Sequence, residues 1–166
     1  MLKNRMKKFI IDALNTSRLG EFYCQRRKDF IFGNGGFVVR LHDVDLSQYY
    51  HDKEKVQQAE KILERVKEKG RAWDGVPMTP PSISRLKNLI RANEHRDVVL
   101  YWFTAGLSYN ARIMLPVLKL LGNCKMDFRR LTGYIHYGPH KRESDEWALY
   151  LVGDHGEAVI MPYAWR

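Results

Sequence analysis

Cysteine is scarce in this chain, whose 166 residues include only Cys24 and Cys124. The two lie far apart, each in an apolar, strand-like stretch, and neither fits the spacing of a metal-binding cysteine cluster. We therefore predict two buried, reduced thiols and a cytoplasmic location. The scarcity excludes the small secreted domains whose stability depends on several disulfides.

Long hydrophobic runs are also missing. No apolar run approaches the roughly 20 residues that a membrane-spanning helix needs, and the first residues lack the pattern of a secretory signal. Hydrophobic residues nevertheless make up 45% of the chain and aromatic residues 12%, enough to build a core. We therefore expect a single folded domain over residues 1–166 rather than a disordered tail.

Acidic residues are too few to balance the basic ones. The chain has 28 Lys and Arg against 19 Asp and Glu, a net charge of +9. Such a balance favours a polyanionic partner such as nucleic acid, although a merely basic surface remains the alternative. The first 28 residues are especially basic, with only Asp12 and Glu21 against Lys3, Arg5, Lys7, Lys8, Arg18, Arg26, Arg27 and Lys28.

Catalytic motifs are lacking as well. No nucleophile elbow, phosphate-binding Walker loop or paired zinc motif occurs, so we predict no catalytic residue, no metal and no cofactor. Two groups keep a metal site open as an alternative: the histidines His136, His140 and His155, and the aspartates Asp43 and Asp45. Loop histidines and a solvated strand end are the simpler interpretations, because Gly138-Pro139 prevents a helix and no third carboxylate accompanies the aspartates.

Periodicity predicts a helix followed by a β-meander in the first third of the chain. Apolar residues of 3–17 recur at helical spacing. Strands are expected at Glu21–Arg27, Asp29–Phe32 and Phe37–Leu41. The glycine-rich turn Gly33–Gly36 favours a hairpin, because a phosphate-binding loop would have to be followed by a helix.

The middle block, about 47–96, reads as a helical elaboration. A charged amphipathic helix ends at Gly70, and the proline-rich loop Gly75–Pro81 separates it from a second helix that Ser82 can cap. We expect these helices to lie outside the framework made by the flanking halves.

The last part is expected to form a strand over Asp97–Thr104, then a helix capped by Asn110 and stopped by Gly122. Arg112 and Lys119 are the polar stripe of this mostly apolar helix. Strands should follow at Cys124–Leu131, Thr132–Tyr137, Trp147–Val152 and Glu157–Tyr163, with a tight turn at Gly153–Gly156. The fold class is therefore α+β, with two halves that each combine a helix with antiparallel strands.

The helix Tyr109–Gly122 and the terminal Val159-Ile-Met-Pro162 resemble the last domain of the bacterial DNA polymerase III beta sliding clamp. That family implies a DNA-clamp-like fold of two βαβββ units, here with a helical insertion. It also implies a non-enzymatic accessory protein of DNA replication or repair that binds duplex DNA without sequence specificity. Because clamp rings contain six such domains, a homo-oligomer is one expectation.

The resemblance assigns residues to two surfaces. Arg112 and Lys119 would face DNA phosphates, and so would Arg5 and Lys8 of the first helix. Met161 and Pro162 match the pocket that receives peptides from polymerases and other clients. The match breaks at Tyr163–Arg166 and at Pro116, which lies inside a helix.

Alternation of the last strand places Val159, Met161 and Tyr163 on one side. We predict that Met161, Pro162, Tyr163 and Trp165 form an apolar peptide site. The alternative is that the aromatic tail only seals the domain. A protein-only adaptor and a small metal-dependent DNA enzyme are the other function classes that the sequence leaves open.

Overall fold

The computed structural model describes residues 8, 22–34, 36–46, 53–69, 78–104, 107–137 and 140–163. The expected first helix lies outside these residues except for Lys8, which is helical and exposed. The described elements, in chain order, are β1 (Phe22–Arg26), β2 (Asp29–Asn34), β3 (Phe37–Leu41), α2 (Lys53–Lys69), α3 (Ile83–Ala92), β4 (Leu100–Thr104), β5 (Leu107–Asn110), α4 (Ala111–Leu121), β6 (Cys124–Tyr137), β7 (His140–Gly153) and β8 (Gly156–Ile160).

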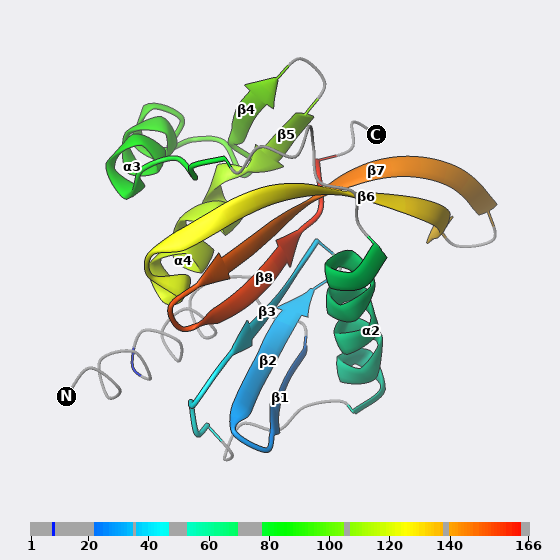
Figure 1. The fold of residues 1–166 in the computed structure, drawn as a ribbon. Helices are drawn as coiled ribbons and strands as arrows, with labels where there is room; N and C mark the ends of the chain where they lie inside the picture. The colour runs from blue at the N-terminus through cyan, green and yellow to red at the C-terminus, as the bar shows by residue number, and fades with distance from the viewer. Residues whose placement is uncertain are drawn as a thin grey trace.

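Six strands form one antiparallel sheet in the order β1-β2-β3-β8-β7-β6 (Figure 1). The sheet consists of two three-stranded meanders, β1–β3 and β6–β8, which join where β3 pairs with β8 from Phe37↔Ile160 to Leu41↔Gly156. Strands β4 and β5 make a separate antiparallel pair. The predicted α+β class with antiparallel strands is thus confirmed.

Two turns hold the meanders in register. The β2–β3 turn occurs at the predicted glycine-rich stretch, where the Gly36 N–H donates to Asn34 Oδ1 at 2.7 Å. The β7–β8 turn occurs at Asp154-His155, also as predicted. Gly156 follows this turn, at the point where β8 approaches the backbone of β3 closely. A Cβ on Gly156 would collide with the carbonyl oxygen of Arg40.

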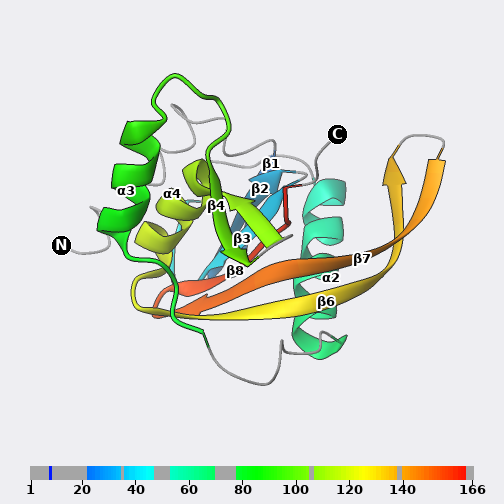
Figure 2. The same ribbon diagram turned by 90° about the horizontal axis from the view of Figure 1, so that it is seen from above.

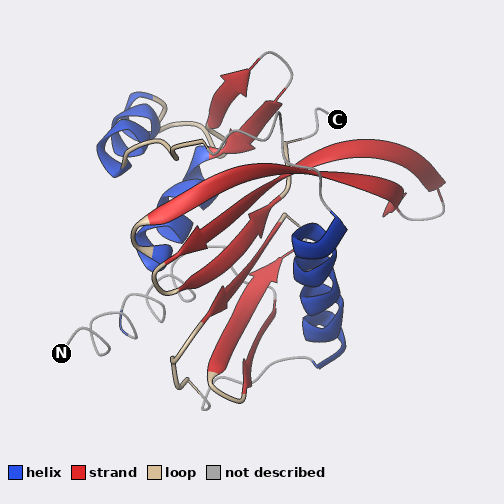
Figure 3. Ribbon diagram, viewed as in Figure 1, coloured by secondary structure: helices blue, strands red, loops and turns tan. Residues whose placement is uncertain are grey.

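Helix α2 covers one face of the sheet (Figure 3). Its buried residues Ala59, Leu63 and Val66 pack on side chains of the sheet, namely Ile31, Val38, Ala148, Tyr150 and Val159. The expectation that the middle helices stand outside the framework is therefore wrong for α2. Lysine and glutamate dominate its sequence, but the three small or branched residues are enough to bury one side.

The opposite face carries the larger core, under α4, α3 and the β4–β5 pair (Figure 2). Met114, Val117 and Leu121 of α4 are fully buried there. Tyr109 stacks against Phe128 with ring centroids 6.0 Å apart. Its hydroxyl donates to the Trp147 carbonyl at 2.6 Å, which ties β5 to β7.

The helix ends agree with the sequence. Ser82 Oγ accepts the Arg85 N–H at the start of α3, and Asn110 Oδ1 accepts the Arg112 N–H at the start of α4. Gly122 follows α4 with φ of 79°, a conformation that favours glycine. Helix α4 continues through Pro116.

Several strand limits differ from expectation. β6 is one strand of 14 residues rather than two, and β7 begins at His140 instead of Trp147. β8 ends at Ile160, before the proline. A second strand, β5, follows β4, because the short Leu107–Asn110 segment pairs with it in a hairpin. Among the described helices, none combines the length and the apolar character that crossing a membrane would require.

Candidate nucleic-acid interface

The cations expected to contact DNA lie in different environments. Lys119 is exposed in the last turn of α4, and Lys8 is exposed as well. Arg112 is half-buried in the first turn of α4. Arg5 lies outside the described residues.

Arg112 is tied to the chain that follows α3. Its Nε donates to the Arg96 carbonyl at 3.0 Å, and its Nη2 donates to the carbonyls of Glu94 at 3.1 Å and Asn93 at 3.4 Å. Asn93 is the C-cap of α3, so the guanidinium contacts the backbone where that helix ends. The guanidinium therefore joins α4 to the end of α3, and its role toward DNA stays a prediction.

Lys87 of α3 and Lys119 of α4 are exposed cations on two helices that share the larger core. Partial burial lowers the pKa of Lys119, and repulsion by the Lys87 charge lowers it further. A phosphate placed beside both groups would relieve their repulsion.

More exposed cations surround this pair. Arg85, Lys87, Arg91 and Arg96 are all exposed in and just after α3. Residues 78–122 contain six Lys and Arg but only two acidic residues, Glu94 and Asp97. The sequence analysis missed these residues, although the apolar side of α3 already implied that its arginines and lysine face outward.

Helix α2 holds as many cations but more acidic residues. Residues 53–69 carry six Lys and Arg against four Glu. Two of these glutamates form ion pairs with the sheet, Glu60 with Arg26 at 2.9 Å and Glu64 with Arg40 at 3.2 Å. Residues 78–122 therefore hold the larger excess of positive charge, four against two on α2.

A hollow of about 570 Å³ adjoins this surface, between the start of α3 and the end of α4. Its walls are Thr79, Pro80, Pro81, Ser82, Ile83, Leu118, Lys119, Gly122, Asn123, Cys124 and Asp154. Cys124 is half-buried rather than fully buried, and burial together with Asp154 raises the pKa of its thiol. The side chain of Cys24 lies outside the description.

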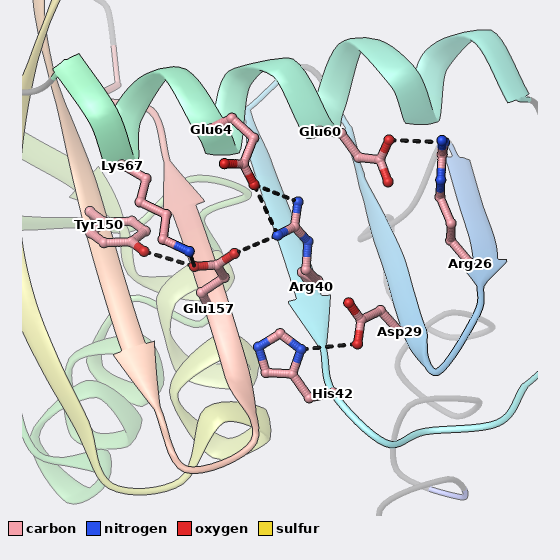
Figure 4. Close-up of polar contacts among 9 residues, drawn as sticks. All are labelled: Arg26, Asp29, Arg40, His42, Glu60, Glu64, Lys67, Tyr150 and Glu157. Atoms are coloured by element: carbon pink, nitrogen blue, oxygen red, sulfur yellow. Dashed lines mark hydrogen bonds and ion pairs between the residues drawn. The ribbon is translucent and has the colours of Figure 1, made fainter.

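A second polar cluster lies between α2 and the sheet (Figure 4). Glu157 is buried, and its carboxylate accepts from Arg40 at 2.9 Å and from the Tyr150 hydroxyl at 2.7 Å. Lys67 approaches the same carboxylate at 3.9 Å. Burial and the bond to Glu157 raise the pKa of Tyr150 well above its ordinary range. The ion pairs of Glu64 and Lys67 in this cluster fasten α2 to the sheet.

The structure separates the histidines that could have formed a metal site. His140 begins β7, whereas His155 lies in the turn after the other end of this strand. A 14-residue strand is roughly 45 Å long, so the three-histidine alternative is wrong. Asp43 lies in the left-handed region with φ of 57°. Across the described ranges, neither it nor Asp45 belongs to a group of three possible metal ligands.

The residues predicted to bind a peptide lie at and beyond the end of β8. Val159 faces α2 and Ile160 faces the larger core, as the alternation predicted, and Met161 packs beside Val159. β8 is a central strand, so a peptide cannot pair along it. Beyond it, the N–H groups of Met161 and Tyr163 donate to the carbonyls of Gly36 at 2.8 Å and Ser108 at 2.9 Å.

Trp102 is an exposed aromatic residue that the sequence analysis missed, because it lies within an apolar run. Its side chain is 50% exposed and that of Tyr163 is 39% exposed. Trp102 pairs with the buried Ser108, whose carbonyl receives the Tyr163 N–H. The two aromatic residues thus lie on either side of Ser108, while Trp165 is outside the described residues.

Comparison with known proteins identifies no relative, so the function is inferred from the structure itself. The chain matches no protein-family model, no curated protein and no solved structure.

Proposed function

We propose that this chain is a non-enzymatic accessory protein that binds duplex DNA without sequence specificity, through the surface of α3 and α4. The observation that carries the proposal is the group of exposed cations on α3 and α4, Lys87 and Lys119 among them, in a stretch with few acidic residues. Around them, Arg85, Arg91 and Arg96 are exposed. Each phosphate contacted releases counterions, which favours binding at low salt.

The proposed binding reads phosphates and not bases. Lys and Arg side chains spread over two helices can follow a phosphate backbone, whereas base recognition requires an element that enters a groove. In this proposal Arg112 orients α4 relative to α3 and Lys119 contacts phosphate. Arg5 and Lys8 are further proposed phosphate contacts, which rest on the family resemblance alone.

A clamp-like role in replication or repair is the finer form of this proposal. Two features support it: the two meanders that meet at β3 and β8, and the helix α4 that precedes the second meander. A single clamp-like domain would have to combine with further domains to encircle DNA.

The test compares two variants that change the net charge equally. Lys87→Glu with Lys119→Glu reverses the proposed surface, and Lys61→Glu with Arg65→Glu reverses two exposed cations of α2. Binding to a duplex of arbitrary sequence is measured from low to moderate salt. Each lost phosphate contact should flatten the log–log salt slope by about 0.9. We expect weak binding and a flatter slope for the first variant only, and equal losses for both would reject the α3–α4 surface.

A client-peptide site is a second candidate function, supported by the exposed Trp102 and Tyr163 beside the end of β8. Aromatic residues at the surface are favoured anchors for a partner. Met161 and Pro162 would form the wall and Trp165 would extend the site. A fluorescent clamp-client peptide should bind the wild type and lose affinity on Trp102→Ala. Peptide binding without DNA binding would indicate a protein-only adaptor instead.

A further inference from the structure

The β6–β7 ribbon extends beyond the rest of the sheet. β6 and β7 pair along their whole length, from Cys124↔Gly153 to Tyr137↔His140. β8 pairs with β7 only between Leu149 and Gly153. The remaining part of the ribbon projects past α2, away from the body of the protein (Figures 1 and 2).

In this projecting part, β6 and β7 pair with each other and with no other described strand. On the β6 side, Met78 forms a single bridge to Met126, with its N–H donating to the Met126 carbonyl at 3.3 Å. Beyond Met126, no other described strand pairs with the outer edge of β6. A two-stranded ribbon is only marginally stable in water, and its free N–H and C=O groups are a template for another strand.

The two edges differ in chemistry. On β7, the segment Lys141–Glu146 is charged at five of its six positions. Charged residues are the usual protection of an edge strand against pairing. On β6, the segment Leu131–Tyr137 contains no Lys, Arg, Asp or Glu and is rich in aromatic and β-branched residues, which favour strands. The β6 edge is therefore the unprotected one.

We propose that Leu131–Tyr137 pairs with the same segment of a second copy, antiparallel and around a two-fold axis. Such an axis, perpendicular to the sheet, places one residue opposite the same residue of the second copy. If that residue is Tyr134, each of the seven residues has a partner in the second copy, and Ile135 lies opposite Gly133. It also sets Tyr137 against Leu131, an aromatic–aliphatic pair. The two six-stranded sheets then become one continuous sheet.

A second copy fits this edge better than nucleic acid does. The ribbon residues 131–137 and 140–146 carry two Lys and Arg against three Asp and Glu, so they do not attract phosphates. Two copies of a +9 chain repel each other over most of their surface, and this uncharged segment is where they can approach. The symmetric pair is also closed, because both charged β7 edges remain on the outside.

The test uses the full chain without DNA, so its outcome is independent of the proposed DNA binding. Tyr134→Lys places two like charges at the centre of the proposed pair. Ser144→Lys adds the same charge to the other edge of the same ribbon and serves as the control. Sedimentation velocity should show a dimer for the wild type and Ser144→Lys, and a monomer for Tyr134→Lys with unchanged far-UV circular dichroism.

A wild-type monomer at every concentration overturns the proposal. The proposal is also overturned if Ser144→Lys dissociates the dimer and Tyr134→Lys does not, because the contact would then lie on β7. A second measurement covers the case in which Tyr134→Lys does not fold. Under mild oxidation Tyr134→Cys should form a covalent dimer, because opposed strand positions lie within disulfide reach. Wild type and Ser144→Cys should not, and an equal yield from all three would reject the register.

Discussion

Arg40 of β3 and Glu157 of β8 lie directly opposite each other in the central strand pair, with Arg40 Nη1 2.9 Å from Glu157 Oε1. Arg40 also reaches Glu64 of α2 at 3.2 Å. One guanidinium thus connects both halves of the sheet to the helix that covers them. Arg40 is the point through which α2 and the central strands are coupled.

Removing Arg40 should therefore destabilise the protein strongly. Arg40→Ala leaves the buried Glu157 with a distant lysine and a tyrosine hydroxyl, and loss of one partner of a buried pair costs about 3 kcal/mol. Arg26→Ala, which breaks a half-exposed pair with Glu60, should cost less than about 1 kcal/mol. Urea unfolding measures both free energies. Similar losses would show that the Arg40 cluster is no more than a surface pair.

Arg112 offers a way to separate structure from DNA contact. Arg112→Gln removes hydrogen bonds to carbonyls after α3 and should cost about 1–2 kcal/mol in the free energy of unfolding. If the guanidinium is occupied by those carbonyls, the salt slope of DNA binding should stay close to wild type. Arg112→Lys should not restore stability, because an ammonium lacks the planar fork of donors. A slope flatter by about 0.9 would instead assign Arg112 to a phosphate.

Lys119 should make stability depend on alkaline pH. Its pKa in the folded protein is below the ordinary value of 10.5, so the unfolded chain binds more protons between these two values. Stability attributable to this group therefore rises with pH through that window and is lowest, and constant, below it. Lys119→Gln removes the titrating group and should therefore remove this rise. Urea unfolding of both proteins from pH 7 to 10.5 measures it, and the same pH dependence in both would contradict the prediction.

Gly156 should not tolerate a side chain. The Cβ of Gly156→Ala would collide with backbone atoms of Arg40 and Leu41 in the central strand, which cannot move without disturbing the pairing. We expect a loss of about 2–3 kcal/mol. Gly36→Ala is the control, since its Cβ meets only the Asn34 side chain at 3.3 Å. Thermal unfolding measures the loss, and equal melting temperatures for the two variants would contradict the close approach of Gly156 to the backbone of β3.

Local chemistry made much of the fold predictable. Asn110, Ser82 and Gly122 are capping residues with one favoured position relative to a helix, and the structure places each there. The β2–β3 and β7–β8 turns were predictable because tight hairpin turns often need a positive φ, which glycine adopts readily. These signals depend on neighbours in sequence, so they are visible without the fold.

Long-range packing could not be predicted in the same way. Nothing in the lysine- and glutamate-rich sequence of α2 says that Glu64 meets an arginine of β3. The charged segment before Trp147 has the composition of a loop. In the structure it is a strand, which continues the register that β7 already has with β6. The common location of Lys87 and Lys119 depends on how α3 packs on α4, and the exposure of Trp102 depends on which side of β4 the core occupies.

The pairing of β3 with β8 has a consequence for the order in which the protein folds. β3 comes from the first third of the chain and β8 from its last residues, so the centre of the sheet is its least local contact. During synthesis, β1–β3 can form early, but Phe37–Leu41 must wait as an open strand until the ribosome releases residues 156–160. Non-local pairing of this kind slows folding and exposes strand edges to aggregation. A nascent chain stalled before Gly156 therefore exposes the edge of β3 that β8 covers in the folded protein.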